Sequence, residues 1–148
     1  MKVWTSFNYS ERNGTPITHI IVHHTDGLMP GCAEWLCNPE SKVSAHYLIE
    51  RDGNIHQLVS DVKAAWHAGT KKWNRCSIGI ELETAYRKPV FTAQQMLSLR
   101  LIVWIIMNHY KIPVANILGH KEIAPGRKTD PAFSMDWFRG LLETESIL

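Results

Sequence analysis

Several features that would mark a specialised class of protein are scarce in this sequence. There are only three cysteines, an odd number without dense spacing, so a disulfide framework does not define the fold. The longest apolar run, residues 101–107, is far shorter than the roughly 20 residues that a membrane-spanning helix needs. The formal net charge is +2, too small to steer the chain onto nucleic acid or an anionic membrane. We therefore expect neither a nucleic-acid partner nor stable membrane insertion.

The amino-terminal segment and the cysteine positions bear on where the protein works. Residues 1–16 lack the apolar stretch of a secretory signal, so we expect synthesis in the cytoplasm without signal-peptide export. Cys32 and Cys37 are close enough in sequence for one local bridge, but we expect two free thiols. The chain has 148 residues, and soluble domains contain roughly 150. This length predicts a single domain over residues 1–148, which we expect to be a monomer.

Histidine is the residue type present in excess. The chain contains eight histidines in an otherwise ordinary composition of 45% hydrophobic and 20% charged residues. Histidine is the commonest metal ligand and a proton carrier near neutral pH. We interpret His19, His56 and His109 as structural or surface residues, so the candidates for chemistry are the other five.

The hydrophobic pattern predicts strands that alternate with helices. Thr92 and Gln95 form a capping-box signature before an apolar run that Pro113 ends, which predicts a helix over residues 93–110. The β-branched segment 19–24 is typical of a central strand covered on both faces. The other predicted elements are a hairpin of residues 46–50 and 54–59 around Asp52-Gly53, a strand at 77–84, and helices at 33–38 and 135–142. Together they predict an α/β fold with a central mixed sheet flanked by helices.

Residues able to do chemistry gather in two short segments. His23 and His24 end the first predicted strand, where successive side chains alternate faces, so only one of them can project into a site. The loop 119–131 is stiffened by prolines and carries His120, Lys128 and Asp130. If this loop is extended, Lys128 and Asp130 share a face and could serve a metal site or an anion site.

The predicted strand at 77–84 adds two carboxylates. Ile78 and the apolar residues that alternate with it point to one face, and Glu81 and Glu83 point to the other. Parity therefore predicts one core face and one acidic face, but it does not separate the two glutamates.

Five sequence blocks, in this order, resemble the zinc-dependent N-acetylmuramoyl-L-alanine amidases. The blocks are Ile21–Thr25, Ser44–Gly53, Ala65–Gly69, Ser77–Glu83 and Gly119–Pro131. The family includes amidase-type phage lysozymes, bacterial cell-wall amidases and peptidoglycan recognition proteins. The resemblance covers about residues 17–140, nearly the whole chain.

The resemblance implies a catalytic zinc site. Its ligands would be His23, His120 and Asp130, which hold one Zn²⁺ per chain in a groove on one face of the sheet. Two imidazoles and a carboxylate leave the fourth tetrahedral position open for water. The implied reaction is hydrolysis of the amide between N-acetylmuramic acid and L-alanine in peptidoglycan.

The resemblance also assigns the remaining chemistry. Glu81, rather than Glu83, occupies the family's proton-transfer position, and Lys128 occupies that of the oxyanion-stabilising lysine. Ala45 stands where the phage lysozyme has tyrosine, which fits the members in which glutamate assists the water. The residues expected to contact the glycan-peptide substrate are His67, Trp66, His46 and Arg127.

The biological role leaves alternatives open. The absence of a signal peptide favours a phage-type endolysin that reaches the cell wall after holin-type release. A cytosolic muropeptide-recycling amidase would have similar features, and the chain could also be one domain of a longer wall hydrolase. A non-catalytic peptidoglycan-binding module is disfavoured because all three ligand positions hold competent ligands. Signatures of zinc metalloproteases, deaminases and serine hydrolases are absent from the sequence.

Overall fold

The structure is a computed structural model, and residues 2–144 of the chain are described. Two short 3-10 turns, Pro39–Ser41 and Val114–Asn116, accompany the main elements. In chain order, the main elements are β1 (Tyr9–Glu11), β2 (His19–His24), α1 (Gly31–Cys37), β3 (Tyr47–Ile49), β4 (Ile55–Gln57), β5 (Lys63–Ala65), α2 (Lys71–Cys76), β6 (Ser77–Leu82), α3 (Ala93–Tyr110), β7 (Ile117–Gly119), α4 (His120–Ile123) and α5 (Met135–Leu142).

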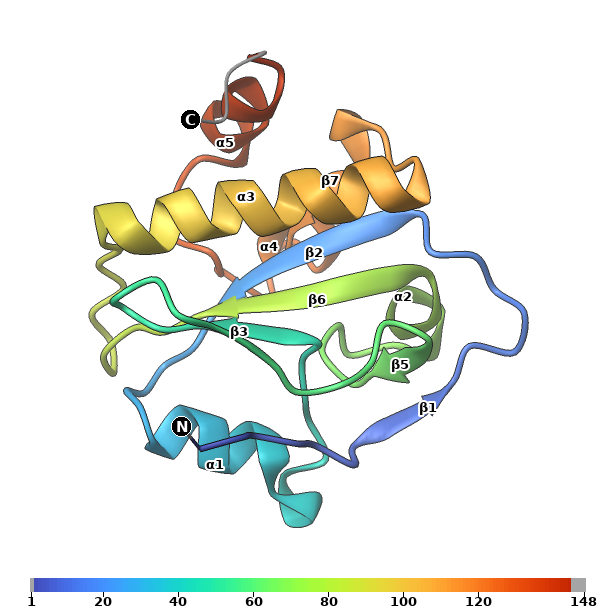
Figure 1. Cartoon of the computed structure of the whole chain (residues 1–148), viewed down its shortest axis with the longest axis vertical. Helices are drawn as coiled ribbons and strands as arrows, with labels where there is room; N and C mark the ends of the chain where they lie inside the picture. The colour runs from blue at the N-terminus through green and yellow to red at the C-terminus, as the bar shows by residue number, and fades with distance from the viewer. Residues whose placement is uncertain (1, 145–148) are drawn as a thin grey trace.

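A five-stranded mixed sheet forms the centre of the molecule, as predicted. Its strand order is β4-β3-β6-β2-β7 (Figure 1). β2 pairs in parallel with β6 and β7, and β3 pairs in parallel with β6, whereas β3 and β4 form the predicted antiparallel hairpin. A separate two-stranded ribbon joins β1 to β5. The carboxyl ends of the parallel strands therefore meet at one edge of the sheet.

One face of the sheet carries the larger core. Ile20 and Val22 of β2 pack with Ile78 and Ile80 of β6 against α3 and α5, and all four side chains are fully buried. Burying one such side chain stabilises the fold by about 1.5–3 kcal/mol. α3 begins and ends where the sequence predicts, with the expected capping box.

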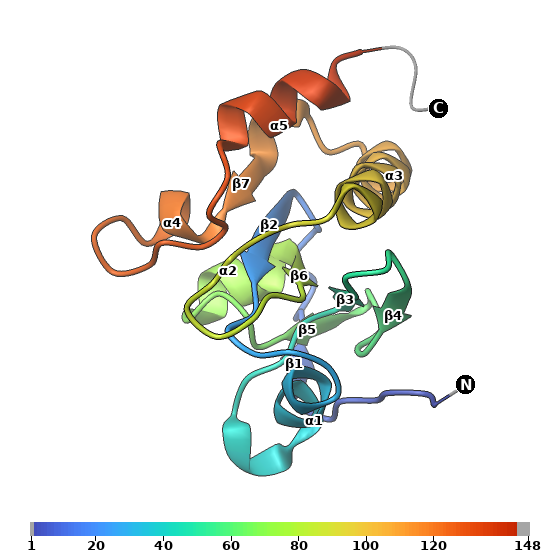
Figure 2. The ribbon, with the colours of Figure 1, turned by 90° about the vertical axis from the view of Figure 1, so that its left-hand side faces the viewer.

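The opposite face is covered only in part. Leu48 of β3 packs with Ala33 and Leu36 of α1 and with Trp4 in a second cluster. Figure 2 shows α3 on one side of β2, and α2 and α4 on the other. α1 covers the β3 end of this face, and beside it His23 of β2 and Glu81 of β6 line a cleft.

Several boundaries differ from the sequence prediction for local reasons. The helix expected at 33–38 begins at Gly31, and the strand expected to reach 84 ends at Leu82. Beyond Leu82, Thr84 forms hydrogen bonds with Thr25 that involve their side chains, and it does not continue the hydrogen-bond ladder of the strand. The elements β1, β5, α2, β7 and α4 were not expected from the sequence. In residues 2–144 the three cysteines are free.

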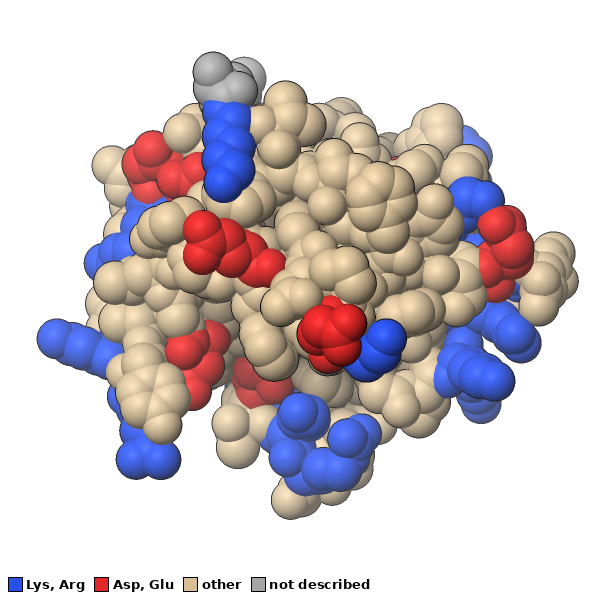
Figure 3. All heavy atoms as spheres, turned by 90° about the horizontal axis from the view of Figure 1, so that it is seen from below, with Lys and Arg blue, Asp and Glu red and all other residues tan. Residues whose placement is uncertain are grey.

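Surface charge and helix hydropathy agree with the composition. Figure 3 shows Lys and Arg side chains interspersed with Asp and Glu on the face seen from below, without a continuous field of one sign. Among the described residues, none of the helices is both long enough and apolar enough to span a membrane.

Candidate metal centre

The two histidines at the end of β2 have different surroundings, as strand alternation requires. His23 is 1% exposed and lines the cleft on the partly covered face of the sheet, which is called the open face below. His24 Nδ1 accepts a hydrogen bond from the backbone N–H of Ala132 at 3.2 Å. His24 therefore ties the loop after β7 to the sheet, and His23 is the member of the pair that faces a site.

The loop after β7 brings two further ligand atoms to His23. His120 is the first residue of α4, directly after β7. Asp130 is held near it because the backbone N–H of Lys121 donates to the Asp130 carbonyl at 2.8 Å. A Cβ at Gly119 would lie 2.9 Å from Pro131 Cδ, so the close return of this loop requires glycine there.

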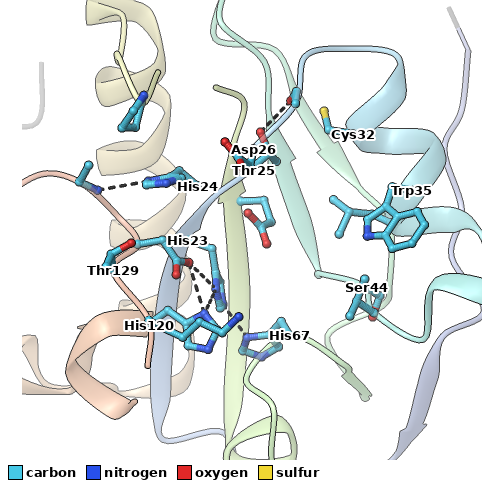
Figure 4. A pocket seen from close by; sticks show the side chains of 18 of the residues that line it. His23, His24, Thr25, Asp26, Cys32, Trp35, Ser44, His67, His120 and Thr129 are labelled. Carbon is cyan, nitrogen blue, oxygen red and sulfur yellow. Dashed lines mark hydrogen bonds and ion pairs between the residues drawn. The ribbon is translucent and has the colours of Figure 1, made fainter. Parts of the chain in front are cut away.

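Three potential ligand atoms converge in a small triangle, shown in Figure 4 with His23 and His120 labelled. His23 Nδ1 lies 3.1 Å from His120 Nδ1 and 3.2 Å from Asp130 Oδ2, and the third side measures 3.3 Å. Ligand bonds of 2.0–2.1 Å in a tetrahedral site place neighbouring ligand atoms roughly 3.3 Å apart. The geometry of the three residues therefore fits a zinc ion.

The charge state of the triangle also suits a cation. Burial is the largest influence on the pKa of the Asp130 carboxyl and would raise it, but contacts with the imidazoles of His120 and His23 outweigh burial and lower the pKa. Burial lowers the pKa of His23, which keeps its imidazole neutral. A carboxylate and a neutral imidazole are the forms that bind metal.

Glu81 lies beside this triangle on the same face. It lines the cleft that His23, His120 and Asp130 share. Burial, followed by repulsion from Asp130, raises the pKa of Glu81 to about 8. Within residues 2–144, Glu81 Oε2 is buried without a hydrogen-bond partner. A buried, unpaired carboxyl at a metal site is a candidate proton carrier.

Glu83 has a different environment, although it follows the same strand parity. Its Oε1 accepts from the backbone N–H of Met29 at 2.8 Å, and its Oε2 accepts from that of Arg51 at 2.7 Å. Its side chain is hydrogen-bonded to the loops after β2 and β3, and it is not among the residues that line the cleft.

The cleft around the metal centre has a volume of about 830 Å³. Trp66, His67, Arg127 and Lys128 line it and also line an adjoining hollow of about 530 Å³. Arg127 and Lys128 are exposed. Figure 4 shows Trp35 and Ser44 on the side of the cleft away from His24 and Thr129. Three of the four residues expected to contact substrate therefore border the cleft.

His46, the fourth, does not border the cleft. It is fully buried, and its Nδ1 accepts from the backbone N–H of Gly79 at 3.0 Å. Its Nε2 lies 2.8 Å from the Lys63 carbonyl. Burial lowers the pKa of His46 to about 3. The structure thus places His46 between β6 and β5, where it joins backbone segments and has no access to a substrate.

Two residues near the site were not singled out in the sequence. Ser77 Oγ lies 3.1 Å from His67 Nε2, and Trp35 is an exposed aromatic side chain on the cleft wall. Ser77 shares the strand parity of Glu81, and this was the available signal for it. Trp35 carried no signal, because a single tryptophan in a short helix is equally compatible with core packing.

The sheet and its site define a class of protein. An α/β fold that holds two imidazoles and a carboxylate at one end of an open cleft has the layout of a mononuclear zinc hydrolase. Residues 13–133 match the N-acetylmuramoyl-L-alanine amidase family. The chain belongs to this family.

Individual relatives agree with the family match. The chain is 45% identical over 109 residues to the 1,6-anhydro-N-acetylmuramyl-L-alanine amidase AmpD of Haemophilus influenzae, covering 69% of this chain and 59% of the relative. The corresponding AmpD of Escherichia coli is 42% identical over 113 residues, covering 71% and 61%. The chain thus spans about three-fifths of the length of these curated relatives.

Solved structures share the fold. A crystal structure of an AmpD derivative superposes with a TM-score of 0.78 at 31% identity, covering 92% of this chain and 90% of that one. The Escherichia coli amidase AmiD, solved with anhydro-N-acetylmuramic acid-L-Ala-D-γ-Glu-L-Lys, superposes with a TM-score of 0.74 at 28% identity. That match covers 90% of this chain and 66% of AmiD.

Proposed function

We propose that the protein hydrolyses the amide between N-acetylmuramic acid and L-alanine in peptidoglycan fragments, with one zinc ion per chain. The observation that carries the proposal is the triangle of His23 Nδ1, His120 Nδ1 and Asp130 Oδ2, with sides of 3.1–3.3 Å. Beside it lies Glu81, whose Oε2 is buried without a hydrogen-bond partner among residues 2–144. Family membership supplies the bond that this site would cleave.

In this proposal zinc, when bound, supplies Lewis-acid chemistry and lowers the pKa of water toward neutrality. Glu81 Oε2 accepts the proton of the attacking water and returns it to the leaving amine of L-alanine. The raised pKa of Glu81 makes its carboxylate a stronger base than an ordinary glutamate, and Lys128 favours the ionised form that accepts the proton. Glu83 cannot substitute, since both of its oxygens are engaged by backbone N–H groups.

Lys128 supplies a positive charge close to Glu81. It lines the same cleft as Glu81 and His120, and its charge favours the ionised form of Glu81. A lysine ammonium in this position stabilises the negative charge that develops on the carbonyl oxygen during attack. A module that only binds peptidoglycan needs neither this lysine nor an unpaired buried carboxyl, and their presence in the cleft supports catalysis.

The substrate we favour is a soluble anhydromuramyl peptide rather than the intact wall. This was the alternative in the sequence analysis, and it is supported by the names of the AmpD relatives and by the anhydromuramyl ligand of AmiD. A solved mutant endolysin from Bacillus subtilis is 22% identical to this chain and supports the fold alone. Holin-type release, which we expected with an endolysin, gains no support from the comparisons.

Substrate contacts are assigned to cleft residues only. Trp66 offers an aromatic face to the sugar or peptide, and its indole N–H is anchored on Ser10 Oγ at 2.8 Å. Arg127 presents an exposed guanidinium to the carboxylates of the stem peptide. His46 is withdrawn from this set because it is fully buried.

The test compares two substrates with the zinc-loaded protein. Purified soluble anhydromuramyl peptides and intact sacculi are digested in parallel, and new amino termini are quantified beside new reducing ends. We expect new L-alanyl amino termini without reducing ends, and faster release from the soluble peptides. New reducing ends would contradict amidase chemistry, and faster release from sacculi would restore the endolysin role.

A further inference from the structure

We infer that His67 and Ser77 are positioning residues, which fix the tautomer of His23 so that its Nδ1 lone pair faces the metal. The inference rests on the proposed zinc site and is independent of the substrate. The three side chains form a continuous chain of contacts that ends on the backbone carbonyl of Trp73. The direction of each hydrogen bond in this chain of contacts follows from that carbonyl.

The carbonyl of Trp73 can only accept, so the Ser77 hydroxyl donates to it. The Ser77 oxygen is then an acceptor for His67 Nε2, which lies 3.1 Å away and must carry the proton of that ring. A neutral imidazole has one N–H, so His67 Nδ1 is left with a lone pair.

The same reasoning determines which ring nitrogen of His23 carries the proton. His23 Nε2 lies 2.9 Å from His67 Nδ1 and therefore donates its N–H to it. His23 Nδ1 is then the unprotonated nitrogen, and it is the atom in the triangle with His120 and Asp130. The opposite polarity would require Ser77 to donate to His67, which would deprive the Trp73 carbonyl of this hydroxyl donor.

His67 is held in this position from several sides. Its backbone N–H and that of Ala68 donate to Asn74 Oδ1 at 3.2 and 2.8 Å. A Cβ at Gly79 would lie 2.4 Å from His67 Cγ, so the ring occupies the space that glycine leaves on β6. His67 is 7% exposed, and both of its ring nitrogens have partners. It therefore serves His23 rather than the substrate, which replaces the contact role expected for it.

Ser77 and Ser98 make a matched pair for the experiment. Both hydroxyls donate to a backbone carbonyl, but only Ser77 also lies within hydrogen-bond distance of an imidazole, whereas Ser98 lies on α3 across the sheet. His67→Asn and His67→Leu make a second pair. Asparagine keeps an acceptor oxygen at the place of Nδ1, and leucine has none.

The measurement is zinc affinity by competition with a chromophoric chelator, which needs no enzymatic turnover. Loss of a partner that orients a metal ligand costs about 10–100-fold in affinity. We expect a loss in this range for His67→Leu, about tenfold for Ser77→Ala, and less than about threefold for His67→Asn and Ser98→Ala. Long-range ¹H–¹⁵N spectra of the zinc-loaded wild-type protein should show His23 protonated at Nε2 and bound through Nδ1.

Three outcomes would overturn the inference. These are zinc affinities of His67→Leu and Ser77→Ala equal to that of Ser98→Ala, a His23 bound through Nε2, and a wild-type chain that binds no zinc. If His67→Leu does not fold, Ser77→Ala and His67→Asn carry the same comparison. A protein that binds zinc with this pattern but produces no new L-alanyl amino termini would refute the proposed function and leave the inference standing.

Discussion

His23 and Glu81 are direct partners in the parallel register of β2 and β6, so a proposed metal ligand and a carboxyl that lines the same cleft lie side by side on the open face of the sheet. Both positions precede the carboxyl ends of their strands by one residue. The two side chains share a face because the strands are in register and have the same parity. The sheet itself, rather than a flexible loop, fixes the distance between the proposed proton carrier and the metal.

Replacing Glu81 by glutamine should separate metal binding from turnover. Glu81→Gln keeps the volume of the side chain but cannot accept a proton, so we expect kcat to fall by about 10²–10⁴-fold. Zinc content should stay at one ion per chain, because Glu81 is not one of the three converging ligands. Turnover is followed by release of L-alanyl amino groups, and zinc by elemental analysis. Wild-type turnover in this variant would refute the assignment.

Removal of zinc should abolish activity without unfolding the chain. The proposed ligands His23 and His120 extend from β2, which is a central strand of the sheet, and from α4, which packs against β7 and β2. We expect a chelator to stop amide hydrolysis and added zinc to restore it, while circular dichroism stays native. Bound zinc should raise the melting temperature, since any ligand that binds only the native state stabilises it. Unchanged activity after verified metal removal would contradict the mechanism.

The sequence predicts the large periodic elements of this fold well. α3 and α5 have the predicted bounds because capping residues and an apolar periodicity mark them locally. β1 and β5 were missed because a three-residue strand is too short to show a period, and their pairing depends on contacts between segments far apart in sequence.

The site residues divide in the same way. His23, His120 and Asp130 could be named from sequence blocks, and the geometry brings them together. The difference between Glu81 and Glu83 could not be derived from parity, because it depends on backbone N–H groups of distant loops that occupy only Glu83.

Glu83→Gln should weaken the fold rather than the chemistry. An amide has one acceptor oxygen, so one of the two backbone N–H groups that Glu83 now binds would face an NH₂ group. Leaving such a buried donor unsatisfied costs about 1–3 kcal/mol. We expect urea denaturation to show this loss, with zinc content unchanged and turnover reduced far less than in Glu81→Gln. A collapse of turnover in a stable Glu83→Gln protein would reverse the roles of the two glutamates.

The buried His46 should make the fold sensitive to mild acid. Its pKa is about 3 in the native state against an ordinary value of 6.5. Between these values the unfolded chain binds a proton that the native state excludes. The free energy of unfolding is therefore highest above pH 6.5 and decreases as the pH falls toward 3. For one such group the free energy of unfolding should drop by about 2 kcal/mol between pH 7 and pH 5.

His46→Asn isolates this contribution from other titrating groups. Asparagine can still accept from the backbone N–H of Gly79, but it does not titrate. Arg12 and His67, the charged and titratable neighbours of the ring, remain in place in the variant. We expect urea unfolding of His46→Asn at the two pH values to differ by about 2 kcal/mol less than that of the wild type. Because each protein is compared with itself, a uniform loss of stability in the variant does not affect the result. Equal pH dependence in the two proteins would mean that His46 is protonated in the native state, and that its ring does not hold β6 and β5 together in the neutral form.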